Sequence, residues 1–219
     1  MMISSVISQP QRITLGAQTA EILRTAILNG ELKPGQKLVE RELAELMSVS
    51  QGSIREALRD LEYEGLVTKK LNTATYVTEL SKDQVTEIVE VRVELEPAAF
   101  LLASRRITPE KMQDLEALLR EIEAGVEHND YHRLSSSDFR FHKQVWTLSG
   151  NATLEKMLRQ LCTPLFAYLM IFLSVHKSDL KRRVNSHRIL MDVLKSGEER
   201  EIRKAVSEHV RNAWFQFLD

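Results

Sequence analysis

The character of the chain changes at residue 80, and this change constrains the fold more than any other feature. Before it, the turn Pro34-Gly35 and a β-branched, strand-favouring run over Thr73 to Thr78 interrupt short apolar patterns. Beyond it, apolar residues recur with helical spacing to the end of the chain. We therefore predict a mainly α protein of two domains, with strands only in residues 10–79 and an antiparallel all-α helical bundle in residues 81–219.

Six helices are predicted in the second domain. A capping box of Ser81 and Gln84 starts the first helix, and Thr108-Pro109-Glu110 is typical of a helix start. No Gly/Ser-rich linker separates the two domains, so we expect them to be closely coupled. The predicted helices span residues 81–106, 108–126, 129–149, 151–174, 177–196 and 198–218.

Composition narrows the class of protein. No apolar run reaches the length of a membrane-spanning helix, and the first ten residues lack the features of a secretory signal. The single cysteine, Cys162, excludes an internal disulfide framework and favours a packing role in a reducing cytoplasm. We therefore expect a cytoplasmic protein without membrane contacts. The formal net charge is −1, and residues 1–79 also sum to −1 from nine basic and ten acidic residues, so any DNA contact requires a local basic face.

The first domain has the pattern of a winged helix-turn-helix. A short helix carries Leu43, Ala44 and Leu46, which we expect to face inward, and the turn Ser48-Val49-Ser50 joins it to the next helix. Two β-prone segments then predict the wing. The elements are predicted at residues 15–29, 40–47 and 51–64 for the helices and at residues 66–70 and 74–78 for the strands.

Several polar and basic side chains fall where such a module contacts DNA. The N-terminal end of the third helix enters the major groove in these motifs, and helix N-termini also favour phosphate. Arg55 and Arg59 are four residues apart and share one helix face. The candidates are Ser50, Gln51, Ser53, Arg55 and Arg59, with Lys69 in the wing. In the alternative interpretation, the two arginines only pair with neighbouring acids, which are Glu56, Asp60 and Glu62.

Residues 15–79 resemble the winged helix-turn-helix of the GntR family of bacterial regulators. The matching residues are Ile27, Gly30, Leu32, Pro34-Gly35, Leu38, Glu40 to Ala44, Val49-Ser50, Ile54 to Leu58, Leu61, Glu64 to Val67 and Val77. This resemblance implies that operator DNA is contacted by Arg41, Ser50, Ser53 and Arg55. We also predict a dimer on a palindromic or pseudo-palindromic operator, because one recognition helix reads only a few base pairs and two-fold symmetry increases the specificity.

Two positions depart from the family pattern. Gln51 stands where relatives usually carry a base-reading arginine. Because Gln prefers adenine and Arg prefers guanine in the major groove, we expect an operator that differs from the usual consensus. The wing tip, Asn72 to Thr75, lacks the glycine that is common in the family, which affects the minor-groove contact expected of the wing.

Four helices of the second domain each place a polar residue on an apolar stripe. Buried polar groups are costly without partners, and a single buried histidine is usually a hydrogen-bonded core residue. Three histidines and one aspartate on core faces are better explained by a divalent metal such as Zn²⁺ or Ni²⁺. The expected ligands are Asp138, His142, His187 and His209, and Arg92 lies on the stripe that includes Ile88, Val91 and Leu95. The remaining histidines, His128, His132 and His176, are expected to face solvent.

Residues 82–217 resemble the FCD ligand-binding domain of the FadR subfamily, and six helices rather than seven resemble its shorter, VanR-like type. The matching motifs are Arg92-x-x-Leu95-Glu96-Pro97-Ala98-Ala99, Asp138-x-x-Phe141-His142, His187-Arg188-x-Leu190 and His209. The resemblance implies that the four predicted ligands bind metal and that a small carboxylate effector completes the coordination. Arg92 is the candidate for holding that carboxylate, and the alternative is a structural ion pair with a nearby glutamate.

These expectations describe a homodimeric transcription regulator, not an enzyme, that binds double-stranded operator DNA under the control of a small organic acid. One alternative is a metal-dependent hydrolase, because an open metal position can activate water. Against it, the sequence has no hydrolase motif and no obvious general base beside the predicted site. The other alternative is a DNA-binding protein whose metal is purely structural.

Overall fold

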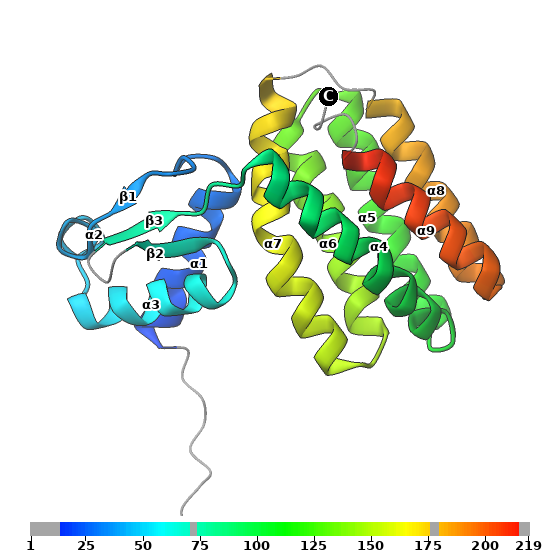
Figure 1. Cartoon of the computed structure of the whole chain (residues 1–219), viewed down its shortest axis with the longest axis horizontal. Helices are drawn as coiled ribbons and strands as arrows, with labels where there is room; N and C mark the ends of the chain where they lie inside the picture. Colours follow the sequence, from blue (N-terminus) through cyan, green and yellow to red (C-terminus); the bar gives the residue numbers. More distant parts are fainter. Residues whose placement is uncertain (1–13, 71–73, 176–179, 215–219) are drawn as a thin grey trace, which may run out of the picture.

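The computed structural model describes residues 14–70, 74–175 and 180–214, and it confirms a winged helix-turn-helix followed by an all-helical bundle (Figure 1). Each predicted helix is present, with ends that differ by a few residues. The N-terminal domain contains α1 (Leu15–Leu28), β1 (Lys37–Leu38), α2 (Glu40–Met47), α3 (Gln51–Tyr63), β2 (Val67–Lys70) and β3 (Ala74–Val77).

Two serines mark the end of α2 and the start of α3. Ser48 adopts a left-handed conformation with φ of 53°, and the Ser50 hydroxyl caps α3 by accepting the Ser53 N–H at 3.1 Å. The prediction for Leu46 was wrong, because this side chain is 81% exposed. The buried face of α2 runs through Leu43 and Ala44, and Met47 packs against the core in place of Leu46.

The wing is part of a three-stranded antiparallel sheet in the order β1-β3-β2. Tyr76 of β3 lies opposite Thr68 of β2 on one side and Lys37 of β1 on the other. The sequence did not predict β1, because two residues are too few to show the alternation of a strand. Its pairing brings Lys37 to the same sheet as the wing.

The C-terminal domain is built around α4, which contacts α6, α7, α8 and α9. The prediction that Val91 faces the core was wrong, since its side chain is 45% exposed. The buried face of α4 passes through Val89, Val93 and Glu96, and Val91 lies on the opposite side of the helix. Within the described residues, no helix has both the length and the hydropathy needed to cross a membrane. The helices are α4 (Lys82–Ser104), α5 (Pro109–Glu127), α6 (Tyr131–Leu148), α7 (Ala152–Val175), α8 (Leu180–Ser196) and α9 (Glu199–Trp214).

Helix α7 forms the side of the bundle that faces the N-terminal domain (Figure 1). Its Ala167 is 8% exposed and belongs to the hydrophobic core of that domain. Gly65, with φ of +76°, lies so close to α7 that an added Cβ would sit 3.4 Å from Pro164 Cγ. The Gln160 amide also donates to the Tyr63 carbonyl at 3.1 Å. The domains are therefore joined by packing as well as by the junction at residue 80.

Candidate functional site

A groove of about 710 Å³ lies between α3, the start of α2 and the sheet of the N-terminal domain. Among its lining residues are five cations and one carboxylate, so it forms a local basic face that the net charge does not reveal. Sequence reasoning missed Lys37, because its position depends on the short strand β1. The lining includes five of the seven predicted DNA contacts, which are Arg41, Gln51, Arg55, Arg59 and Lys69.

The basic side chains of this groove make exposed ion pairs. Arg55 Nε lies 2.6 Å from Glu40 Oε2, so its partner is none of the acids expected from sequence spacing. Lys69 Nζ lies 3.4 Å from Glu62 Oε2. Exposed pairs of this kind contribute little to stability, so DNA phosphates can replace these carboxylates at low cost. Ser50 and Ser53 lie at the first turn of α3, where the Ser50 hydroxyl already serves as the helix cap.

The four predicted metal ligands meet inside the C-terminal bundle, and each is at most 5% exposed. His142 and His209 approach through their Nε2 atoms at 3.1 Å. Asp138 Oδ1 lies 3.1 Å from His187 Nε2 and 3.5 Å from His142 Nε2. One ring nitrogen from each histidine lies within 4.8 Å of those of the other two. The spacing on three helices therefore predicted a true spatial cluster.

The other ring nitrogen of each histidine has its own partner. A carbonyl or carboxylate oxygen can only accept, so Nδ1 of His187 and of His142 donates and leaves Nε2 as the ligand atom in the neutral ring. Metal-binding histidines are held in this way. The Nδ1 contacts are His142 to Glu96 Oε2 at 2.8 Å, His187 to the Arg183 carbonyl oxygen at 2.9 Å and His209 to Ser186 Oγ at 3.0 Å.

Charge in the cluster is balanced by two arginines. Arg92 Nε donates to Glu96 Oε1 at 2.7 Å, and Arg183 pairs with Asp138. Burial alone would raise the pKa of Glu96, but Arg92 and His142 beside it lower that pKa to about 2. The pKa of Asp138 is well below its usual value, because His187 and Arg183 outweigh the effect of burial. Both carboxylates are therefore ionised at neutral pH.

The pKa of His209 is lowered, whereas a carboxylate beside a solvent-exposed histidine raises the pKa of that histidine. Burial lowers its pKa well below the usual value, and the neighbouring His187 and His142 lower it further, against the opposing effect of Asp138. A neutral imidazole beside an ionised carboxylate is the state that metal ligation requires. The donor set of three imidazoles and one carboxylate fits a divalent ion such as Zn²⁺ or Ni²⁺.

The remaining sequence predictions have clear placements. Arg92 is paired with Glu96, as the alternative interpretation expected, and its guanidinium carbon lies 5.3 Å from the centre of the Phe166 ring. His128 and His132 are exposed as predicted, and His176 lies outside the described residues. Cys162 is fully buried, which raises the pKa of its thiol and agrees with a packing role.

Each of the two parts of the chain matches a known protein family. Residues 15–77 match the family model "Bacterial regulatory proteins, gntR family", and residues 87–212 match "FCD domain". McbR, an HTH-type transcriptional regulator of Escherichia coli (strain K12), is 26% identical over 199 residues, which cover 90% of each chain. YdhC, an uncharacterized HTH-type regulator of Bacillus subtilis (strain 168), is 30% identical over 193 residues, or 86% of this chain and 82% of YdhC.

A solved structure of a regulator has a similar fold. Escherichia coli McbR/YncC superimposes with a TM-score of 0.81 at 25% identity, covering 94% of this chain and 100% of that one. The similarity extends over both the winged helix-turn-helix and the bundle. The chain therefore belongs to the GntR family of bacterial transcriptional regulators, carries an FCD domain as its helical bundle, and is a regulator rather than an enzyme.

Proposed function

We propose that the protein binds double-stranded operator DNA as a homodimer, and that a small carboxylate effector, bound with a divalent metal ion in the bundle, controls operator affinity. The observation that carries the proposal is the convergence of three histidine Nε2 atoms and Asp138 Oδ1 in a buried core. Family membership supports the DNA-binding part. The chemistry of the cluster supports the metal, and the FCD domain supports the effector. The dimer is proposed because one recognition helix reads only a few base pairs.

The metal ligands in this proposal are Asp138, His142, His187 and His209. His142 and His209 face each other through Nε2 at 3.1 Å, an arrangement in which one ring must otherwise supply a proton to the other. The Nε2 lone pairs of both rings would instead be satisfied by a divalent ion, which would also supply Lewis-acid chemistry for binding a carboxylate oxygen. Glu96 holds the His142 ring in the required orientation.

Arg92 is proposed to act on the effector from the same side of the cluster. Its guanidinium is bound to Glu96, and Glu96 in turn holds His142, so Arg92 is connected to the ligand set by two contacts. Direct recognition of the effector requires Arg92 to share its donors between Glu96 and the incoming carboxylate. An Arg92→Lys variant tests whether Arg92 recognises the effector directly or only forms the ion pair with Glu96. Lysine keeps the charge but loses the bidentate geometry.

In the N-terminal domain, we propose that DNA is contacted by the groove and the first turn of α3. Gln51 reads a base at the position where its relatives use arginine, and Arg55 leaves Glu40 to contact a base or phosphate. Lys37 adds a backbone contact next to the wing. The full set is Lys37, Arg41, Ser50, Gln51, Ser53, Arg55, Arg59 and Lys69.

The experiment that tests the proposal follows the metal and the DNA together. Protein loaded with Co²⁺ is titrated with lactate, citrate and acetate while metal absorbance and affinity for its operator are measured. A carboxylate that shifts both supports the proposal. If none of them moves operator affinity while the metal remains bound, the metal is structural and effector control by these acids is rejected. Protein that takes up neither Co²⁺ nor Zn²⁺ rejects the metal site itself.

A further inference from the structure

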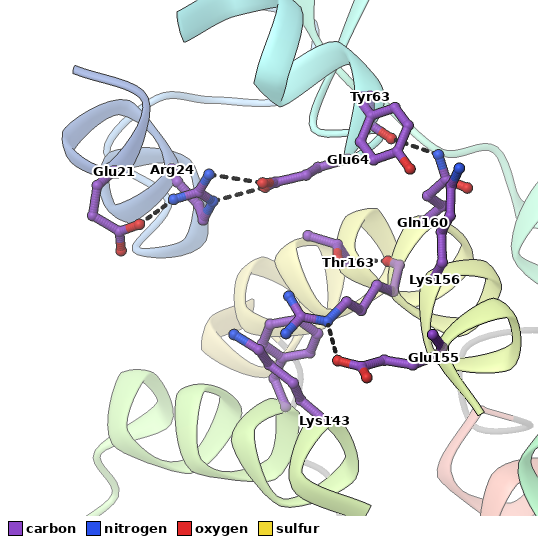
Figure 2. A pocket seen from close by; sticks show the side chains of 12 residues that line it. Glu21, Arg24, Tyr63, Glu64, Lys143, Glu155, Lys156, Gln160 and Thr163 are labelled. Atoms are coloured by element: carbon purple, nitrogen blue, oxygen red, sulfur yellow. Dashed lines mark hydrogen bonds and ion pairs between the residues drawn. The ribbon is translucent and has the colours of Figure 1, made fainter. Parts of the chain in front are cut away.

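A second cavity lies between the two domains, away from the histidine cluster. This cleft has a volume of about 470 Å³, which is within the usual range for a small-molecule site. Figure 2 shows the Arg24–Glu64 pair of the N-terminal domain on one side of it and Lys143 of α6 on the other. Helices α1 and α3 therefore supply one wall, and α6 and α7 supply the other.

Most charges in this cleft are already compensated. Arg24 donates through Nε and Nη2 to the Glu64 carboxylate, both at 2.7 Å, and it also contacts Glu21. Arg159 Nε donates to Glu155 Oε1 at 3.1 Å. The three carboxylates that line the cleft are thus committed to two arginines, and none of them is left to balance a further cation.

Lys143 is that further cation. Its side chain is partly buried, and no carboxylate among the described residues lies within ion-pair distance of its ammonium group. Lys156, the other lysine of the lining, lies 5.2 Å from the centre of the Tyr63 ring. A partly desolvated ammonium group without a counter-charge is unfavourable, and an anion in the cleft would supply the missing charge.

The rest of the lining limits what kind of anion fits. Phe139 lines the cleft, and its ring is fixed by packing at 5.1 Å from the Phe166 ring centre and 6.2 Å from that of Trp146. Tyr63 adds a second aromatic ring from the opposite domain. A lining that combines a cation with aromatic rings is complementary to a carboxylate on a flat apolar body.

We propose that this interdomain cleft is a second ligand site, which binds a small aromatic carboxylate with its charge at Lys143 and its ring near Phe139 and Tyr63. This site is separate from the metal and does not depend on it. Because both domains contribute to its walls, a bound ligand stabilises the docked arrangement of the two domains. By linkage, the ligand and operator DNA then change each other's affinity by the same factor.

The test uses benzoate as the probe and benzamide as its neutral counterpart, on the full chain. Binding is measured by calorimetry with metal-loaded protein and again after chelation. Benzoate is expected to bind both forms equally, with benzamide at least about tenfold weaker. Lys143→Met should weaken benzoate binding about tenfold, Lys143→Arg should retain it, and the exposed control Lys204→Met should have no effect.

Each outcome decides between this site and the metal centre. Benzoate binding that disappears on chelation would place the probe at the metal and overturn the cleft proposal, while leaving effector control intact. Equal affinities for parent and Lys143→Met, or for benzoate and benzamide, would also overturn it, as would no detectable benzoate binding. Because Lys143 follows His142, the metal content and melting temperature of each variant are measured first, and Lys143→Arg serves as the folded reference.

Discussion

The groove of the N-terminal domain gathers its cations from residues 37–69 and keeps them at the surface. The histidine cluster gathers its ligands from residues 138–209, on three helices, and buries all of them. In the groove, Arg55 is 57% exposed and its ion pair with Glu40 is readily exchanged. In the cluster, each histidine is fixed by a second contact. The difference suits the two proposed roles, because a surface that reads DNA needs partners that can be replaced, whereas a metal site needs partners that stay in place.

The largest effect is expected in the buried cluster. His187→Ala removes one ligand and the contact to Asp138, so metal affinity should fall by on the order of 100-fold or more. Parent protein should gain about 5–10 °C in melting temperature when Zn²⁺ is added at saturating concentration, and the variant should gain almost none. The exposed His128→Ala serves as the matched control and should behave like the parent. An equal Zn²⁺-dependent gain in His187→Ala would show that the ion binds elsewhere.

A substitution in the groove should weaken operator binding and leave metal affinity unchanged. Arg55→Ala should weaken operator binding by about 1–3 kcal/mol if Arg55 contacts a base. Because its ion pair with Glu40 is exposed, the melting temperature should hardly change. Filter binding or fluorescence anisotropy at fixed salt provides the measurement, with the exposed Arg200→Ala as control. Unchanged operator affinity in folded Arg55→Ala protein would remove Arg55 from the DNA contacts.

Acidification should weaken the affinity of the histidine cluster for metal. Metal ligation requires neutral imidazoles, so affinity for Zn²⁺ falls as protons compete at lower pH. The pKa of His209 is lowered by burial and by His187 and His142, so its protonation opposes metal only below its ordinary pKa of 6.5. Asp138, whose pKa is well below its usual value, stays ionised throughout. Zn²⁺ affinity should be nearly constant from pH 8 to 6.5 and should fall only as the pH drops well below 6.5, where His209 takes up a proton. A loss of Zn²⁺ that is already complete at pH 6.5 would contradict the lowered pKa of His209.

The smallest effect concerns how the two regions communicate. Helix α4 starts with a complete capping box at Ser81 and carries Arg92 about three turns later, so it can act as a rigid lever. A few glycines inserted between Leu80 and Ser81 should preserve effector binding but remove part of a coupling that is typically about 1–3 kcal/mol. Operator affinity with and without effector measures that coupling. A full response in the extended protein would transfer the role to the direct contact of Gly65 with Pro164.

The architecture could be predicted because its signals are local. Capping residues such as Ser81 and Thr108 indicated the helix starts, and helical spacing placed the predicted ligands Asp138 and His142 on one buried face. The errors arose where periodicity is weak. In a helix of only eight residues, the spacing does not decide whether Leu46 or its neighbour Met47 faces the core. A strand of two residues is too short to show alternating apolar and polar residues.

The partners of the site depend on tertiary packing and were therefore missed. Ser186 and Arg183 reach the cluster only because α8 packs against α9 and lies near α6. Glu96 had one local signal, its four-residue spacing from Arg92, which predicts an ion pair but not its contact with His142. The interdomain cleft could not be predicted at all, because it exists only where α7 meets the N-terminal domain.

Ala167 lies on α7 of the helical bundle but completes the hydrophobic core of the N-terminal domain. This limits how freely the two modules can be recombined. A chimeric regulator that joins this DNA-binding module to another bundle would lose the small side chain at that position, and a larger one would collide with the packed core. Engineering a new sensor from this protein therefore requires Pro164 and Ala167 to be transplanted together with the winged helix, even though both lie nearly a hundred residues further along the chain.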